Sequence, residues 1–396
     1  PSLAVPWIGL ADLGAVVIRA LLERNHLEPS RVQDVLWGCV NQAGEDNRNV
    51  ARMSALLAGL PTSVPGTTVN RLCGSSLDAI IHASRAIWCG DGEILIAGGV
   101  ESMSRAPYSI PKNQSGSFGN VTAYDTALGW RYPNPRMAAM FPLESMGETA
   151  ENVAEKYSIT REEQDAFACE SHRKALLARR EGKFSPEIVP VALPATAASK
   201  RGGLHDSQPD KDRGLLLDDE GPRPDTSLEK LAALPPVFRK NGTVTAGNSS
   251  SLNDGAAALL IAGGAVAQAM GWKPLARVVS TGVAGVDPRT MGMGPVPAVE
   301  IALQKAGLAM NRIDLIELNE AFAATSIAVA RQLRFDPGKL NVNGGAIAIG
   351  HPLGCSGARI MTTLLHEMVR RKARYGIAAM CIGVGQGIAV IVEGMF

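Results

Sequence analysis

The sequence predicts an α/β protein made of two related halves. Helical and strand patterns alternate over the first hundred residues and again from Val244 onward, which is typical of parallel sheets covered by helices. Two separated segments also repeat at a constant offset of 281 residues. The first pairs Leu27, Arg31, Val32 and Val35 with Leu308, Arg312, Ile313 and Ile316, and the second pairs Ser75, Ile96 and Ala97 with Ser356, Ile377 and Ala378. Agreement of two segments at one offset indicates duplication of a βαβ-type half.

The first half shows the alternation clearly. Apolar residues recur at helical spacing over residues 12–24, and a short apolar run follows over 32–40. A second helical stripe covers 75–88, and a buried strand beginning at Glu93 is expected to end at the Gly-Gly pair of residues 98–99.

The middle of the chain has a different character. Repeated prolines exclude long regular elements, so residues 108–143 are predicted to form an irregular loop excursion. Two helices then begin with capping boxes, S-M-G-E at 145–148 and T-R-E-E at 160–163, and the second should end near Gly182.

A polar stretch rich in Gly, Pro and Asp follows over residues 192–226, which indicates an exposed insertion. The expected organisation is an N-terminal half formed by residues 1–103 and 244–270, an inserted loop domain at 104–243, and a C-terminal half at 271–396.

The composition excludes several classes of function. Thirty-nine Lys and Arg against 38 Asp and Glu leave a formal net charge of +1, so no strong field favours nucleic acid or an anionic membrane. The six cysteines never lie two to four residues apart, which argues against a zinc site. The longest apolar stretch, at 255–270, is interrupted by glycines and is too short to span a membrane. Without a secretion signal at the first residues, reduced thiols and a cytoplasmic location are expected.

Cys73 is the first candidate for a reactive group. It lies in V-N-R-L-C-G-S-S-L-D-A-I, directly before the helix predicted over 75–88. A thiol at a helix N-terminus meets the positive end of the helix dipole and unpaired N–H groups, which stabilise a thiolate. A small buried cysteine is the commoner outcome for a lone Cys, so the local pattern leaves both interpretations open.

Three further candidates lie in short motifs. Glycines around His351, in N-G-G-A-I-A-I-G-H-P-L-G, allow close approach of the backbone to a ligand, although a structural imidazole is the alternative. Cys381 precedes alternating glycines whose N–H groups suit an oxyanion, or it is simply a packed cysteine. Asn319 follows a strand in I-E-L-N-E-A-F-A and suits either a site or a helix N-cap.

The internal repeat gives these positions a spatial meaning. The offset of 281 places Asn70, three residues before Cys73, opposite His351, and Val100 opposite Cys381. If the two halves pack as a pseudo-dimer, equivalent loops at the carboxyl ends of their strands converge on one crevice.

Together, these motifs resemble those of the thiolases (acetyl-CoA acyltransferases) from about residue 3 to the end of the chain. The matching motifs are N-R-L-C-G-S-S, G-G-V-E-S-M-S, T-V-T-A-G-N-S-S-S-L-N-D-G, N-E-A-F-A, G-H-P-L-G-C-S-G-A-R and C-I-G-V-G-Q-G. The resemblance implies a duplicated αβαβα layered core. It also implies reversible transfer of an acyl group from 3-oxoacyl-CoA to CoA by a homo-oligomer, a dimer or a dimer of dimers, with no metal or permanently bound cofactor.

The resemblance also assigns roles to matching positions. Cys73 resembles the nucleophile that carries the acyl group as a thioester, His351 the base that activates it, and Cys381 the acid/base at the acetyl α-carbon. Asn319 resembles the residue that holds a water in one oxyanion hole beside His351, and the N–H groups of Cys73 and Gly383 resemble the other hole. The CoA and acyl site of the family is matched by Met146, Arg223, Phe238, Ala246, Ser250 and Phe322.

Three features depart from the family pattern. Thiolases usually begin with a strand and an R-T-P-I-G or R-T-P-F-G segment before the position of Leu3, and we expect such a segment in the complete protein. Ser251 replaces a frequent glycine and is expected to alter the CoA pocket locally. Ser145 precedes Met146 where biosynthetic acetoacetyl-type thiolases often have His, which favours a degradative enzyme.

The substrate prediction rests on fewer residues. L-G-W-R-Y-P-N-P at 128–135 most resembles 3-oxoadipyl-CoA thiolases, with a general 3-ketoacyl-CoA or acetoacetyl-CoA thiolase as the alternative. Arg131 and Arg136 are candidates to bind the distal carboxylate, although loop arginines usually face water. A ketosynthase would carry a Cys-His-His set instead of Asn319 and Cys381, and a non-catalytic acyl-CoA-binding relative would not need to retain these reactive residues.

Overall fold

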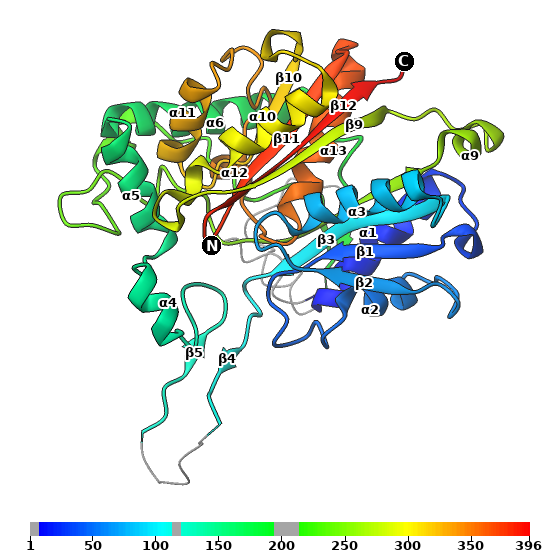
Figure 1. Ribbon diagram of the computed structural model, residues 1–396, viewed down its shortest axis with the longest axis horizontal. Coiled ribbons are helices and arrows are strands. Elements are labelled where there is room, and N and C mark those ends of the chain that lie inside the picture. The colour runs from blue at the N-terminus through cyan, green and yellow to red at the C-terminus, as the bar shows by residue number, and fades with distance from the viewer. Residues whose placement is uncertain (1–7, 113–119, 194–213) are drawn as a thin grey trace.

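The computed structural model describes residues 8–112, 120–193 and 214–396, and Figure 1 shows their arrangement. Two four-stranded sheets form its centre, in the orders β2-β1-β3-β8 and β10-β11-β12-β9. The first contains β1 (Asp34–Gly38), β2 (Gly66–Val69), β3 (Ile94–Ser102) and β8 (Asp254–Ala262), and the second contains β9 (Ala276–Gly285), β10 (Leu315–Leu318), β11 (Tyr375–Ile382) and β12 (Gln386–Gly394). We refer to the elements around these sheets as the N-terminal half and the C-terminal half.

Helices separate and cover the two sheets. The covering helices are α1 (Leu10–Arg24), α2 (Val50–Leu57), α3 (Ser75–Cys89), α10 (Pro295–Ala306), α11 (Ala323–Gln332) and α13 (Ser356–Arg371). α3 and α13 contact each other between the sheets (Figure 1), and their apolar residues share one core with both inner sheet faces. α1 and α2 bury the outer face of the first sheet, and α10 and α11 that of the second. These five layers confirm the predicted αβαβα core.

The sequence repeat corresponds to equivalent elements. α3 and α13 begin at Ser75 and Ser356, and β3 and β11 begin at Ile94 and Tyr375, so both pairs are displaced by 281 residues. β1 pairs in parallel with β3 as β10 does with β11, and an antiparallel strand follows in each sheet. β12 pairs further with β9, whereas no described strand lies beyond β8. The duplication is therefore confirmed.

The helix ends predicted from capping residues are present in the structure. Both capping boxes are present, at the starts of α5 (Met146–Lys156) and α6 (Arg161–Arg180). Gly182 has a φ of +67° after α6, as expected for a glycine that ends a helix.

The prediction that β3 ends at its two glycines is wrong, because the strand continues to Ser102. Close packing explains the glycines instead. A Cβ atom on Gly98 would lie 2.2 Å from the carbonyl oxygen of Ala257, and one on Gly99 would lie 2.1 Å from that of Gly354. Glycine is required at both positions because neighbouring backbone occupies the space of a side chain.

The chain between β3 and β8 leaves the N-terminal half and packs on the C-terminal half. α5 and α6 contact α11, and α6 also contacts α12 (Ala346–Ile349), whereas β4, β5 and α4 extend away from both sheets (Figure 1). The remaining short elements are β4 (Tyr108–Ser109), β5 (Tyr124–Asp125), α4 (Pro135–Met140), β6 (Val191–Ala192), β7 (Leu215–Leu216), α8 (Leu228–Ala232) and α9 (Gly264–Ala269). Much of the insertion predicted at 192–226 lies outside the described residues. The domain boundaries at residues 103, 243 and 270 stay a prediction.

Candidate active site

Cys73 lies on a tight turn between β2 and α3. Leu72 before it has a positive φ of +46°, a conformation that side chains other than glycine rarely adopt. The turn packs against the C-terminal half, because a Cβ atom on Gly74 would lie 2.6 Å from Cδ1 of Ile382. Ile382 follows Cys381 directly, so the structure brings the Cys73 turn to the end of β11 that carries the second cysteine.

Burial decides the protonation state of the Cys73 thiol. The surrounding protein raises the pKa of Cys73 to about 11, although the N–H groups of Gly383 and of Cys73 itself act in the opposite direction. At the isolated site desolvation therefore outweighs the favourable helix dipole, and the protonated thiol is favoured. The thiol needs a base to become a nucleophile.

His351 is a buried, neutral imidazole with a defined tautomer. Burial first, and the charge of Arg359 second, lower the pKa of His351 to about 3. Its Nδ1 lies 2.6 Å from Oγ of Ser356, and that hydroxyl donates at 2.8 Å to the carbonyl of Pro352. Since the hydroxyl hydrogen is already used, Oγ accepts a hydrogen bond from Nδ1–H, so Nε2 is the ring nitrogen that can accept a proton.

Asn253 fixes the backbone of the same residue. The N–H of His351 donates at 3.1 Å to Oδ1 of Asn253, which also accepts from the hydroxyl of Ser251 at 2.8 Å. Gly350 has a φ of +108°, and a Cβ atom there would lie 2.3 Å from the Asn253 side chain. Neither Asn253 nor Ser356 was predicted from the sequence as a site residue; their positions inside the matching motifs were the available signal.

Asn319 lies against the imidazole. Its Nδ2 is 3.4 Å from Nε2 and 3.5 Å from Nδ1 of His351, and its Oδ1 is buried without a hydrogen-bond partner. α11 begins at Ala323 with Phe322 as its N-cap, so Asn319 is not the helix cap that the sequence left as an alternative. An unpartnered buried oxygen of this kind is suited to a bound polar group.

Cys381 lies at the buried end of β11 among apolar side chains. Burial raises the pKa of Cys381 to about 12, and the charge of Cys73 acts in the same direction. Three of the six residues predicted for the CoA and acyl site, Met146, Phe238 and Phe322, belong to the same apolar cluster. The rings of Phe238 and Phe322 meet edge to face with centroids 6.2 Å apart. The structure therefore joins these three residues to Cys381.

The other predicted CoA-binding residues lie outside this cluster. The N–H of Ser250 donates at 3.0 Å to the carbonyl of Ala321, so its segment follows the N-E-A-F loop. Ala246 is exposed in the same segment. Arg223 is exposed as well, and Gly221 before it packs so closely on α12 that a Cβ atom would lie 2.3 Å from a backbone oxygen there.

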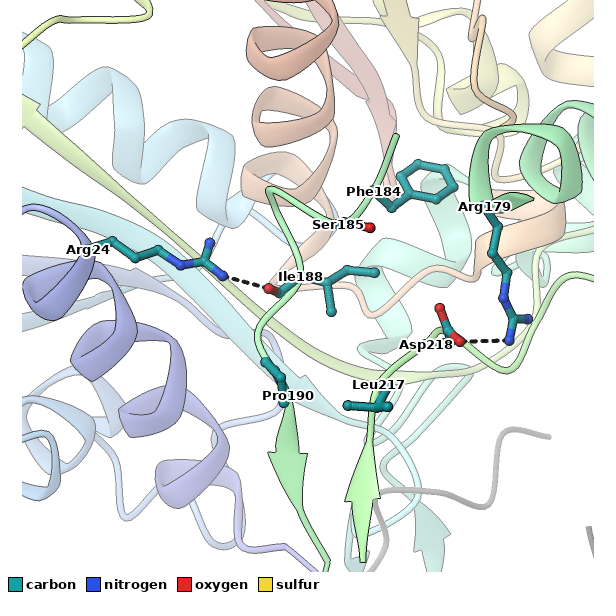
Figure 2. A pocket seen from close by; sticks show the side chains of 8 residues that line it. All are labelled: Arg24, Arg179, Phe184, Ser185, Ile188, Pro190, Leu217 and Asp218. Carbon is teal, nitrogen blue, oxygen red and sulfur yellow. Dashed lines mark hydrogen bonds and ion pairs between the residues drawn. The ribbon is translucent and has the colours of Figure 1, made fainter. Parts of the chain in front are cut away.

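A separate pocket of about 320 Å³ contains none of the predicted site residues. Figure 2 shows that Arg24 and Arg179 reach into it from opposite sides. Both are already engaged, Arg24 with the carbonyls of Pro186 and Ile188 and Arg179 with Asp218. We assign it no part in the site.

Two features are absent from the described residues, which are 8–112, 120–193 and 214–396. In them, no three His, Cys, Asp or Glu side chains are grouped so that they could bind a metal ion. No helix in the same part of the chain is both long and apolar enough to cross a bilayer.

Comparison with known proteins covers nearly the whole chain. Sequence models of the thiolase N-terminal and C-terminal domains match residues 7–265 and 272–394. A beta-ketoadipyl-CoA thiolase of Escherichia coli is 53% identical over 393 residues, which are 98% of this chain and 95% of that protein. A 3-oxoadipyl-CoA/3-oxo-5,6-dehydrosuberyl-CoA thiolase of Escherichia coli (strain K12) is 53% identical over 385 residues, covering 96% of this chain and 93% of that protein.

Solved structures agree. Human mitochondrial 3-ketoacyl-CoA thiolase superposes with a TM-score of 0.89 at 39% identity, covering 99% of this chain and 95% of that one. The acetyl-CoA acetyltransferase of Bacillus anthracis superposes with a TM-score of 0.88 at 40% identity, covering 99% and 94%. With both domain models matched and the duplicated layered fold shared, this chain belongs to the thiolase family of acyltransferases.

Proposed function

We propose that this thiolase cleaves 3-oxoadipyl-CoA with coenzyme A, giving acetyl-CoA and the four-carbon dicarboxylic acyl-CoA. The observation that carries the proposal is the meeting of the Cys73 turn with the end of β11, in a chain 53% identical to a beta-ketoadipyl-CoA thiolase. Degradation is the proposed direction, and a cytoplasmic homo-oligomer the proposed form.

The reaction sets clear chemical demands. Breaking the C2–C3 bond of a 3-oxoacyl-CoA needs a soft nucleophile at the C3 ketone and a proton for the departing acetyl-CoA enolate. It also needs donors for two oxyanions, because the ketone oxygen and the thioester oxygen each gain charge. Two thiols, one imidazole and two sets of donors meet these demands.

In the first half-reaction, Nε2 of His351 takes the proton of Cys73 as the sulfur attacks C3. The C3 oxygen becomes an alkoxide, which the N–H groups of Cys73 and Gly383 stabilise. Its collapse forms the thioester on Cys73 and breaks the C2–C3 bond. Asn319 and the protonated His351 stabilise the enolate oxygen, and the thiol of Cys381 protonates C2 to give acetyl-CoA.

In the second half-reaction, the thiolate of Cys381 takes the proton of the incoming CoA thiol. The CoA sulfur attacks the thioester carbonyl, whose oxygen occupies the same pair of N–H groups. Collapse releases the shortened acyl-CoA and the Cys73 thiolate, which recovers its proton from His351. Every group has then returned to its starting state. The raised pKa values of Cys73 and Cys381 support this scheme, because both start as thiols.

The acyl and CoA portions of the substrate would be bound by different parts of the crevice. We assign the acyl wall to Met146, Phe238 and Phe322, which pack with Cys381. Ala246, Ser250 and Arg223 are assigned to CoA, since Ala246 and Arg223 are exposed and a guanidinium suits a phosphate.

A substrate panel tests the proposal. Loss of the absorbance of the Mg²⁺-complexed enolate on addition of CoA is measured with 3-oxoadipyl-CoA, 3-oxohexanoyl-CoA and acetoacetyl-CoA. The first two have equal chain length and differ in the distal carboxylate. We expect the highest kcat/KM with 3-oxoadipyl-CoA, whereas a preference for 3-oxohexanoyl-CoA would indicate a general 3-ketoacyl-CoA thiolase.

The assignment of the nucleophile has its own test. Brief incubation with acetyl-CoA followed by peptide mass mapping should place one acetyl group on Cys73, and Cys73→Ala should abolish the label. Label found only on Cys381 would reject the proposed mechanism.

A further inference from the structure

Glu101 is a buried carboxylate at the end of β3, with 1% of its surface exposed. Its Oε2 accepts hydrogen bonds from the N–H groups of Val40 at 3.0 Å and Gly354 at 2.9 Å, and its Oε1 accepts from Asn41 at 3.1 Å. The thiol of Cys39 lies 3.9 Å from Oε1. All four groups donate and so stabilise the ionised carboxylate, although burial raises the pKa of Glu101.

Gly354 belongs to the loop that carries the proposed base. It lies three residues after His351 and two before Ser356, whose hydroxyl accepts from the imidazole. The backbone of this loop enters the N-terminal half, since a Cβ atom on Gly354 would lie 2.7 Å from Cα of Cys39. The close approach leaves no room for a side chain, and because Gly354 is buried its N–H needs a partner within the protein, which Glu101 supplies.

We propose that Glu101 is a positioning residue for acyl transfer, which sets the His351 loop relative to the Cys73 turn. The inference rests on the roles proposed above for these two residues. Cys73 is carried by the N-terminal half and His351 by the C-terminal half, so their separation depends on contacts between halves. The hydrogen bond from Gly354 to Glu101 is such a contact and joins positions 253 residues apart in the chain.

Geometry, and not charge, explains what Glu101 would contribute. Its negative charge is among the influences that raise the pKa of Cys73, so by charge alone it opposes formation of the thiolate. Proton transfer requires heavy atoms within about 2.6–3.2 Å of each other. A displacement of the base by about 1 Å costs on the order of a hundredfold in rate. A residue that opposes thiolate formation by charge can still favour the reaction by holding the base in place.

Two substitutions separate these effects. Glu101→Asp keeps the charge but shortens the side chain by one methylene group, so it lengthens the hydrogen bond from the Gly354 N–H to the carboxylate. Glu101→Gln removes the charge but keeps the shape, and its amide oxygen can still accept from Val40 and Gly354. Ser76→Ala is the control, because Ser76 accepts another hydrogen bond between the halves, from the N–H of Ala358 at 2.9 Å.

Acylation of Cys73 by acetyl-CoA is followed in single turnovers by mass spectrometry, together with steady-state kcat, KM and the urea midpoint of each variant. We expect acylation about a hundredfold slower in Glu101→Asp and about tenfold slower in Glu101→Gln, with KM within about threefold of wild type. Ser76→Ala should lose stability and acylate at the wild-type rate.

The proposal is overturned if Glu101→Asp acylates at the wild-type rate, if Glu101→Gln is the slower of the two, or if Ser76→Ala slows acylation as much. Wild-type protein that is not acylated on Cys73 would reject the proposed function instead, so the two failures are distinguishable.

Discussion

Nδ1 of His351 lies 2.6 Å from Oγ of Ser356, in a buried contact five residues apart in the chain. The contact lies at the start of α13, where Ser356 also bonds the carbonyl of Pro352. It therefore selects the imidazole nitrogen that can take a proton, since the other nitrogen is engaged. An identical histidine without this partner would interconvert between tautomers.

Ser356→Ala removes the acceptor of the Nδ1–H bond. A hydrogen bond of about 1–1.5 kcal/mol corresponds to roughly a tenfold lower kcat/KM with acetoacetyl-CoA. Ser84→Ala is the matched control, because Ser84 is also buried in a helix and donates to the carbonyl four residues before it at 2.8 Å. Equal losses in both variants would mean that only helix stability had changed.

Cys381→Ser separates the two cysteines. A serine hydroxyl is a far weaker acid than a thiol, so proton transfer at the acetyl α-carbon should slow by about a hundred- to ten-thousand-fold. Acylation of Cys73 by acetyl-CoA should persist, which peptide mass mapping checks. Wild-type turnover would refute the acid/base assignment, and loss of acylation would point to a structural part for Cys381.

Glu317 should make stability depend on pH. It is 2% exposed on β10, and burial raises the pKa of Glu317 from 4.5 to about 8. Between these values the folded state keeps a proton that the unfolded state releases, so the free energy of unfolding falls as the pH rises through this window. Glu317→Gln does not titrate.

The Glu317→Gln variant should therefore gain stability relative to wild type between about pH 6.5 and 8.5. Urea midpoints of both proteins at the two pH values measure the change. A difference between variant and wild type that is the same at both values would contradict the prediction.

Arg131 and Arg136 are the candidates for recognition of the distal carboxylate. Arg131 is partly buried and bonds the carbonyl of Thr126 at 3.0 Å, whereas Arg136 is exposed on α4. Replacement of either by Ala should lower kcat/KM for 3-oxoadipyl-CoA, because the distal carboxylate of the substrate loses a charged partner. The expected loss corresponds to about 1.5–3 kcal/mol of transition-state free energy. Acetoacetyl-CoA, which has no distal charge, is the control substrate. Equal losses on both substrates would indicate damage to folding, and no loss would exclude both arginines from recognition of the distal carboxylate.

The sequence by itself determined the elements whose causes are local. The helix after Cys73 and the capping boxes of α5 and α6 formed as predicted, because periodicity and capping act within a few residues. The duplication could also be predicted from the sequence, since equivalent segments of the two halves keep a constant offset of 281 residues. The two glycines of β3 were misread, because the backbone that requires them belongs to Ala257 and Gly354, each more than 150 residues away in the chain.

Tertiary structure decided the chemical state of the site. The position of Cys73 before a helix predicts a thiolate, yet burial raises its pKa to about 11. The hydrogen bonds that hold the His351 loop could not be predicted from the sequence either. The one from His351 to Asn253 spans 98 residues, and the one from Gly354 to Glu101 spans 253. Desolvation and hydrogen bonding between distant segments depend on which surfaces pack together, and no local pattern of residues encodes that.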